Sequence, residues 1–261
     1  MGKTIFITGA GSGLGKGTAI GLAKKGYHVI ATTETTSQKT DLIREIRDKN
    51  LDMETFKLDI TNPIDQREIE KYDFDIFVAN AAINEGGPLG EIPMERFRAI
   101  FEVNVFATLE TAQIAAKKLV EKGKGKIIFL SSMAGIMTTP YAGPYAATKH
   151  AIEAIALTLK DELKEFGVQV ATINPGSFDT GFNDRAVEEK YKWFNEEKNF
   201  TCKEDMKRME EGLKNQLDPE EMINKMIEII PADHHKFRTV FPEQTEKQMK
   251  EAEQEKWSKQ I

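Results

Sequence analysis

The sequence predicts an α/β fold in which one parallel, doubly wound sheet carries helices on both faces. Short apolar runs rich in β-branched residues alternate with stretches in which apolar residues recur at helical spacing. A glycine cluster from Gly9 to Gly15 joins the first of these runs to the first helical stretch, as in the strand–turn–helix unit that opens such a sheet. We find no internal repeat and no linker, so residues 1–261 are expected to form a single Rossmann-like domain.

The first half of the chain supplies the alternating elements of this sheet. We expect strands over residues 3–8 and 27–33, with a helix between them that ends at Gly26. A helix over 40–49, a strand ending at Asp59, a short polar connection over 63–72 and a strand over 75–79 follow. One long helix with an apolar face is expected from about residue 93 to residue 121.

The second half completes the sheet and adds a charged insertion. Strands are expected over 126–130, 168–173 and 237–241, and a long helix starts near Pro144, because proline suits the first turn of a helix. Over residues 183–217 charged residues become dense while aromatic and aliphatic residues keep helical spacings. This segment is either a helical lid over a substrate pocket, which we favour, or packing for the core. A further helix begins at Asp218-Pro219, and the tail from residue 243 is also expected to be helical.

Composition and charge exclude several classes of protein. The net charge of −6 at pH 7 argues against nucleic acid or an anionic membrane as a partner, and no apolar run is long enough to span a membrane. The single cysteine, Cys202, rules out a disulfide framework, and the start shows no secretory signal, so a cytoplasmic location is predicted. The histidines and Cys202 lack metal-ligand spacing, so no metal site is predicted.

The glycine cluster predicts a dinucleotide-binding site. Glycines between a strand and a helix let the backbone approach a pyrophosphate, which rests at the positive N-terminus of the helix. The spacing is Gly9-x-x-x-Gly13-x-Gly15, which is neither G-x-G-x-x-G nor a P-loop. Glu34 follows the second strand about where an acidic residue binds the ribose 2′-hydroxyl, and no Arg or Lys occurs between residues 26 and 38. This favours NAD over NADP; the alternative is that Glu34 is simply a surface residue.

Tyr145 and Lys149 form the candidate catalytic pair. They stand four residues apart in the first turns of a helix and therefore share one face. A phenol has a pKa of about 10; a fixed ammonium beside it lowers that pKa, so that the tyrosine can exchange a proton with an alcohol or carbonyl oxygen. Ser132, after the preceding strand, is placed to hydrogen-bond the same oxygen. Asn104, in an otherwise apolar stretch, is either a structural bracket or part of the polar site.

These motifs in this order resemble the single-domain short-chain dehydrogenases/reductases over roughly residues 3–181. The resemblance rests on the glycine pattern after Thr8, on Asp59 and Asn80-Ala81 after the third and fourth strands, and on Asn104, Ser132, Tyr145, Lys149, Pro175, Gly176 and Thr180. It implies an NAD(P)-dependent oxidoreductase that interconverts a secondary alcohol and a ketone by hydride transfer.

The resemblance also implies a role for each matching residue. Tyr145 is the general acid/base, and Lys149 lowers its pKa and binds the nicotinamide ribose. Ser132 stabilises the developing oxyanion, and Asn104 holds a water of a proton relay. Cofactor contacts are expected from Gly9, Ser12, Gly13, Leu14 and Gly15 at the pyrophosphate, from Glu34, Asp59, Ile60, Asn80 and Ala81 at the adenosine, and from Tyr145, Lys149, Pro175, Gly176 and Thr180 at the nicotinamide end.

The chain departs from the family pattern at three places. Ala79 stands where relatives often have an Asn ahead of Asn80, many relatives with a similar second strand carry Arg where Glu34 stands and use NADP, and the common Asp-Gly-Gly ending is absent. The substrate is therefore predicted only as a partly apolar alcohol or ketone, which Phe178 and Phe182 suggest. The resemblance implies a homotetramer or homodimer built on the long helices. A dinucleotide-binding regulatory protein without turnover is the alternative function, and the intact catalytic set argues against it.

Overall fold

A parallel sheet of seven strands, in the order β3-β2-β1-β4-β5-β6-β7, organises the chain. The computed structural model describes residues 2–259, except for the side chains at positions 208, 209 and 212. Because every neighbouring pair of strands is parallel, all the strands end at the same edge of the sheet. The predicted doubly wound fold is confirmed. The strand order changes direction between β1 and β4, and ligands of such sheets bind at the carboxyl ends of the strands next to this point.

Strands and helices alternate along the chain much as the sequence predicts. The elements are β1 (Thr4–Ile7), α1 (Gly13–Lys24), β2 (His28–Thr33), α2 (Thr36–Lys49), β3 (Met53–Lys57), α3 (Pro63–Arg67), η1 (Glu68–Lys71), β4 (Ile76–Ala79), α4 (Met94–Phe101), η2 (Glu102–Ala107), α5 (Thr108–Lys122), β5 (Gly125–Leu130), η3 (Met133–Gly135), α6 (Gly143–Glu162), η4 (Lys164–Phe166), β6 (Val168–Pro175), α7 (Phe182–Tyr191), α8 (Lys203–Leu213), α9 (Pro219–Ile229), β7 (Arg238–Phe241) and α10 (Gln244–Glu255).

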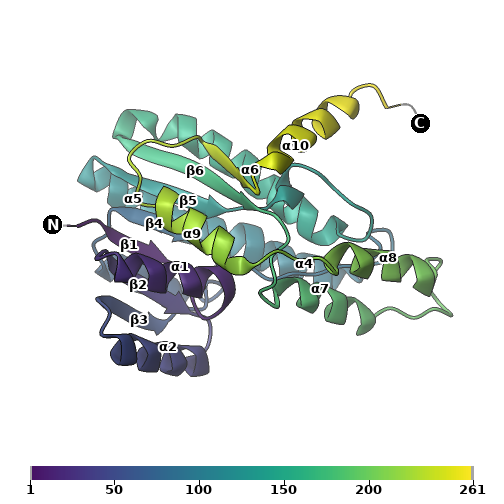
Figure 1. Cartoon of the computed structure of the whole chain (residues 1–261), viewed down its shortest axis with the longest axis horizontal. Helices are drawn as coiled ribbons and strands as arrows, with labels where there is room; N and C mark the ends of the chain where they lie inside the picture. The colour runs from purple at the N-terminus through teal and green to yellow at the C-terminus, as the bar shows by residue number, and fades with distance from the viewer. Residues whose placement is uncertain (1, 260–261) are drawn as a thin grey trace.

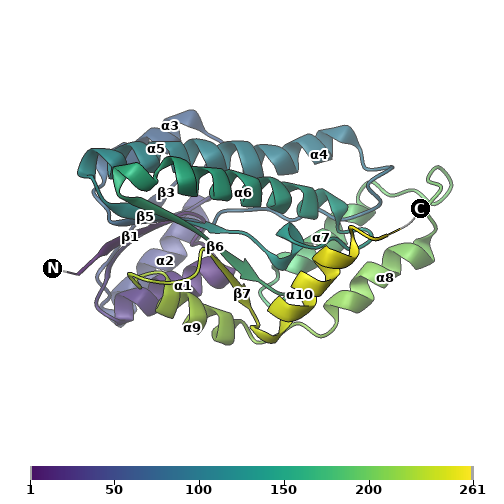
Figure 2. The same ribbon diagram turned by 90° about the horizontal axis from the view of Figure 1, so that it is seen from above.

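Two hydrophobic layers hold the helices against the sheet. Figure 2 shows α3, α4, α5 and α6 on one side of the strands and α1, α2 and α9 on the other. Successive side chains of β1 alternate between these layers: Ile5 and Ile7 belong to the layer of α1 and α9, and Phe6 to the layer of α5 and α6. This alternation follows from the two-residue period of a strand, and burial on both faces explains why the strand sequences are continuously apolar.

Three elements differ from the sequence prediction, each for a local reason. Helix α2 begins at Thr36, because Thr35 and Gln38 form a capping box. The connection over 63–72, predicted to be a short polar link, contains α3 and η1, and the side chain of Asn62 caps α3. The helix predicted from about residue 93 to 121 is present as α4 and α5, but η2 between them is π-helical.

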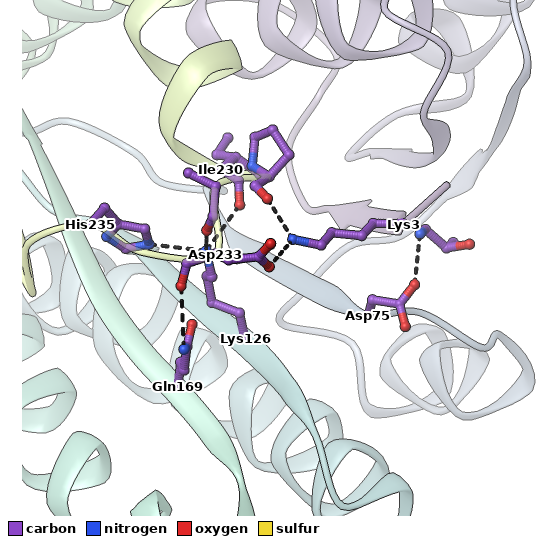
Figure 3. Close-up of polar contacts among 10 residues, drawn as sticks. Lys3, Asp75, Lys126, Gln169, Ile230, Asp233 and His235 are labelled. Atoms are coloured by element: carbon purple, nitrogen blue, oxygen red, sulfur yellow. Dashed lines mark hydrogen bonds and ion pairs between the residues drawn. The ribbon is translucent and has the colours of Figure 1, made fainter. Parts of the chain in front are cut away.

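Two lysines bind the C-terminal end of α9 at the edge of the sheet opposite the strand ends, as Figure 3 shows. Lys126, near the start of β5, is only 4% exposed. Its ammonium donates to the carbonyls of Ile230, at 3.3 Å, and Ala232, and lies 3.0 Å from Nε2 of His235. Lys3 donates to the Pro231 carbonyl at 2.6 Å. The cations therefore bind carbonyls of the segment that directly follows α9, close to the negative end of that helix.

The buried ammonium of Lys126 makes the free energy of unfolding depend on pH in the alkaline range. Burial lowers the pKa of Lys126 to about 8, whereas in the unfolded chain it is about 10.4. Between these values the unfolded state binds a proton that the folded state does not, so the free energy of unfolding rises with pH. We expect Lys126→Met to make this rise from about pH 8 to pH 10 smaller, as measured by urea unfolding, while the second buried lysine with a pKa lowered to about 8, Lys149, keeps its own contribution. A slope equal to that of the wild type would contradict the assignment.

No helix within residues 2–259 is both long and apolar enough to cross a membrane. The same part of the chain holds no group of three or more His, Cys, Asp or Glu residues that could bind a metal ion.

Candidate active site

The carboxyl ends of the strands surround a cavity of about 470 Å³. Every residue predicted to bind the cofactor lines it, namely Gly9, Ser12, Gly13, Leu14, Gly15, Glu34, Asp59, Ile60, Asn80, Ala81, Tyr145, Lys149, Pro175, Gly176 and Thr180. Three of the four predicted catalytic residues, Ser132, Tyr145 and Lys149, also line it, whereas Asn104 does not. Parallel strands thus bring residues separated by more than a hundred positions to one place.

The glycine loop between β1 and α1 is held by the end of β4. The side-chain amide of Asn80 donates to the carbonyls of Thr8, at 2.8 Å, and Gly9, at 2.9 Å. In return, the Thr8 hydroxyl accepts from the backbone N–H groups of Asn80 and Ala81. A Cβ on Gly9 would lie 2.6 Å from Cα of Ala81, so this close approach requires glycine. Asn80 therefore shapes the cradle, which is a use that the sequence did not indicate.

The N-terminus of α1 faces the cavity with free backbone donors. Its N-cap residue, Ser12, makes no side-chain capping hydrogen bond within the described chain, and the first turn carries no acidic residue. The first N–H groups of a helix have no partner inside it and carry partial positive charge. Gly13, at the first position, would place a Cβ 3.5 Å from Thr180. An anion here is thus bounded by the glycine loop on one side and by the segment after β6 on the other.

Glu34 and Asp59 are two acidic residues in the lining of the cavity. Glu34 is exposed, immediately beyond β2, and lines the cavity. Asp59 uses one carboxylate oxygen to accept from the backbone N–H of Thr61, at 2.9 Å, and from its hydroxyl, at 2.7 Å. These two hydrogen bonds hold the Asp59 side chain in place.

Tyr145 and Lys149 lie together in the lining of the cavity. Both belong to the first two turns of α6, and the ammonium of Lys149 is 5.5 Å from the centre of the Tyr145 ring. The ammonium donates to the Leu130 carbonyl at 2.8 Å, which ties the pair to the end of β5. Ser132, whose hydroxyl accepts from the backbone N–H of Ala134 at 3.1 Å, lies two residues after Leu130. The predicted grouping is therefore present in the structure.

Burial sets the protonation of the pair. It raises the pKa of Tyr145 above its ordinary value, and the hydroxyl of Ser132 opposes this effect without reversing it. Burial also lowers the pKa of Lys149 to about 8, against the opposing influence of the Glu153 carboxylate. Desolvation of the phenol is the largest cause of the raised pKa of Tyr145, and the role of Lys149 in lowering that pKa stays a prediction. At neutral pH Tyr145 carries its proton.

Asn104 lies behind the cavity and acts as a bracket. Its carbonyl oxygen accepts from the backbone N–H of Ile83, at 2.9 Å, and its amide donates to the Ile83 carbonyl, at 2.9 Å, and to the Thr148 hydroxyl, at 3.2 Å. The side chain therefore joins η2 to the segment after β4 and to the catalytic helix α6. These bonds match the structural alternative for Asn104. Its role in a proton relay stays a prediction.

The segment between β6 and α9 contributes Phe178 and residues 180–183 and 185 to the lining of the cavity. It leaves and rejoins the core at a bridge between Phe178 and Leu217, and α7 and α8 lie beyond one end of the sheet (Figures 1 and 2). The ring of Phe182 meets that of Tyr145 edge to face, with centroids 5.7 Å apart. Arg96 of α4 forms a salt bridge with Glu189 of α7, with a distance of 3.0 Å, which ties α7 to α4.

Sequence reasoning missed several residues that line the cavity. They are Gly11, Gln38, Leu58, Thr61, Ala82, Ile83, Val103, Leu130, Ser131, Gly181, Asn183 and Arg185. A signal existed for one of them: the capping box Thr35-x-x-Gln38 starts α2 and directs Gln38 towards the glycine loop, where a Cβ on Gly11 would lie 2.6 Å from it. Gly11 lies within the glycine cluster, although no contact was assigned to it. The others belong to no motif and reach the cavity only through the packing of the chain.

Comparisons with known proteins agree with this geometry. A family model described as short chain dehydrogenase matches residues 3–191. An (S)-acetoin-forming diacetyl reductase from Staphylococcus epidermidis is 34% identical over 199 residues, which cover 74% of this chain and 77% of that protein.

Two solved structures are also similar. The structure of a gluconate 5-dehydrogenase from Burkholderia cenocepacia, in complex with NADP and tartrate, is 28% identical with a TM-score of 0.67, covering 74% of this chain and 77% of that one. A short-chain dehydrogenase/reductase from Burkholderia phymatum, in complex with NAD, reaches a TM-score of 0.82 at 20% identity over 99% of this chain and 96% of its own. At that identity the second likeness shows a shared fold.

The doubly wound sheet, the glycine cradle and the Tyr–Lys pair define an oxidoreductase of the dinucleotide-binding class. The family model covers most of the chain, and a relative at 34% identity spans about three quarters of it. The chain belongs to the short-chain dehydrogenase family, and it is an NAD(P)-dependent oxidoreductase that acts on CH–OH groups. The resemblance seen in the sequence is confirmed.

Proposed function

We propose that this protein interconverts a ketone and a secondary alcohol with Tyr145 as the general acid/base, and that at neutral pH it works best as a reductase. The observation that supports this is the phenol of Tyr145, which lines the cavity beside Lys149 and whose raised pKa keeps it protonated at neutral pH. A carbonyl oxygen that receives a hydride on its carbon needs a proton donor within reach, and the phenol is that donor.

The residues around the cavity fit a dinucleotide. The cradle at Gly9 and Gly15 has no room for side chains, since a Cβ on Gly15 would lie 2.4 Å from the Asn80 amide. The N-terminus of α1 offers free N–H groups to a diphosphate. When bound, the nicotinamide supplies the hydride that reduces the carbonyl carbon.

The chain's own residues supply the proton and the charge stabilisation. As the carbon gains the hydride, the carbonyl oxygen takes the Tyr145 proton, and the O–H bond of the phenol breaks. Ser132 donates to the same oxygen and stabilises its negative charge. Lys149 stabilises the phenolate that is left until solvent returns a proton. In alcohol oxidation the same groups work in reverse.

The substrate is proposed to be a small, partly apolar ketone. Phe182 packs on the catalytic tyrosine, and Phe178 lines the same cavity, so an apolar group next to the carbonyl would be buried there. The similar diacetyl reductase is named for a compound of this kind. Residues 183–217 are proposed as the lid that covers it.

A panel of carbonyl compounds tests the proposal. The purified protein is mixed with NADH or NADPH and with diacetyl, acetoin, a keto-gluconate or a long-chain 3-ketone, and loss of the reduced cofactor's absorbance is followed. We expect turnover with at least one small ketone. Cofactor binding without turnover on any member would instead favour the regulatory protein.

Glu34 is proposed to select NAD by accepting from the 2′-hydroxyl of the adenosine ribose. We expect Glu34→Arg to shift the ratio of kcat/KM for NADH over NADPH by about 10- to 100-fold towards NADPH, since a hydrogen bond to a charged group is worth about 1.5–3 kcal/mol. Glu34→Gln is the control, because it removes the charge without adding a cation. A ratio that stays constant in Glu34→Arg would show that Glu34 is only a surface residue.

The predicted assembly and location are kept as proposals. Helices α5 and α6 belong to the long helices through which a homodimer or homotetramer is predicted, and Phe106, just before α5, and Leu157 of α6 are about half exposed. Light scattering in solution tests the assembly, and cell fractionation tests the cytoplasmic location.

A further inference from the structure

We propose that Glu153 is a positioning residue for catalysis, which holds Ser132 in place through Asn174 and supports the ammonium of Lys149, with Arg238 as its counter-ion. This inference rests on the proposed function, because Glu153 does not line the cavity and would act on catalysis only through Ser132 and Lys149. Glu153 follows Lys149 by four residues on α6 and is 6% exposed. It therefore lies directly beneath the catalytic lysine.

One oxygen of Glu153 reaches the catalytic serine through a buried amide. The Asn174 amide, on β6, donates to Oε1 of Glu153 at 2.6 Å and to the backbone carbonyl of Ser132 at 3.0 Å. The Asn174 carbonyl oxygen accepts from the Thr172 hydroxyl at 3.0 Å. Asn174 is fully buried, so its amide orientation is fixed by these three partners. Glu153 thus determines where the Ser132 backbone lies.

The loop that follows Ser132 packs on the same turn of α6. A Cβ on Gly135 would lie 2.9 Å from the carbonyl of Lys149 and 3.1 Å from Cγ of Glu153. There is no space for an independent shift of the loop and the helix. A movement of Glu153 would therefore displace Ser132 relative to Lys149.

The second oxygen of Glu153 is held by the C-terminal part of the chain. Oε2 accepts from Nη2 of Arg238 at 2.6 Å and from its Nε at 3.0 Å. Arg238 belongs to β7, which lies after the part of the chain that the family model matches. The positive guanidinium lies beside this buried carboxylate and offsets the free-energy cost of burying its charge.

Glu153 also acts on Lys149 by its charge. In the part of the chain that the structure describes, the ionisable neighbours are Lys149, with Tyr145 beyond it on α6, and Arg238 from β7, while β6 contributes only the neutral Asn174. Burial lowers the pKa of Lys149 to about 8, and the Glu153 carboxylate opposes this. Without the carboxylate, Lys149 loses its proton more readily and stabilises the phenolate less well.

Two substitutions that break the same ion pair separate this role from simple scaffolding. Glu153→Gln removes the negative charge, whereas Arg238→Gln leaves it without a counter-ion. We expect the pH profile of kcat to move to lower pH in Glu153→Gln and to higher pH in Arg238→Gln, with kcat at a fixed pH changing by roughly tenfold per unit of displacement. KM should change little. Arg238→Lys, which keeps the pair, should restore the wild-type profile.

A second readout does not depend on turnover. The pKa of Lys149 is measured by NMR titration of ¹³C-labelled lysine, with its signal assigned through Lys149→Arg. We expect this pKa to fall in Glu153→Gln and to rise in Arg238→Gln. Profiles that move in the same direction, or do not move in either variant, would show that Glu153 and Arg238 have only a structural role. If Glu153→Gln does not fold, the contrast between Arg238→Gln and Arg238→Lys decides. Absence of turnover in the wild type would refute the proposed function, while the titration would still decide the position of Glu153.

Discussion

Tyr145→Phe is expected to lower kcat/KM for ketone reduction by about 10²- to 10⁴-fold, the range that a positioned proton donor contributes. The substitution removes one hydroxyl and keeps the ring that packs edge to face on Phe182. It takes away the only group proposed to protonate the carbonyl oxygen. The substitution leaves the glycine cradle and the N-terminus of α1 unchanged, so NADH binding, measured by nicotinamide fluorescence, should be unchanged.

A matched control for this variant lies four residues earlier. Tyr141→Phe makes the same chemical change in the loop that leads into α6, and Tyr141 does not line the cavity. Its turnover should equal that of the wild type. Wild-type turnover in Tyr145→Phe would instead assign the proton to another donor.

Gly9→Ala is expected to weaken both folding and NADH binding. Gly9 has a φ of +67°, and an added Cβ would lie 2.6 Å from Cα of Ala81, a backbone atom. The positive φ costs about 1–2 kcal/mol for a residue with a side chain, and overpacking costs a further 1–3 kcal/mol or so. Because the clash pushes the loop away from β4, we expect the Kd for NADH to rise by at least tenfold.

Gly26→Ala separates these two costs. Gly26 has a φ of +86°, but no atom lies within 4 Å of its added Cβ. It should lose only the conformational part of the free energy of unfolding, as measured by urea denaturation, and should bind NADH normally. Equal losses in the two variants would show that the approach of Gly9 to Ala81 carries no energy of its own.

The candidate site was predictable from sequence wherever its residues lie next to a strand end or on one helix face. Glycine after β1, Asp59 after β3 and Asn80 after β4 follow apolar runs, and parallel strands bring such positions to one edge. Tyr145 and Lys149 are paired by helix spacing alone. The π-helical turn at Asn104 left no such signal, because nothing in the apolar pattern distinguishes it from the α-helix on either side.

The sequence by itself determined the order of the elements, the doubly wound sheet and the gathering of glycines, serine, tyrosine and lysine at one edge, since these follow from local periodicity and chain direction. Only the tertiary structure decided the protonation of Tyr145, because the pKa depends on how deeply other elements bury the phenol. It also decided that Asn104 holds Ile83 and that Glu153 meets Arg238, 85 positions away. Such contacts depend on how helices and strands pack, and spacing along the chain does not encode that packing.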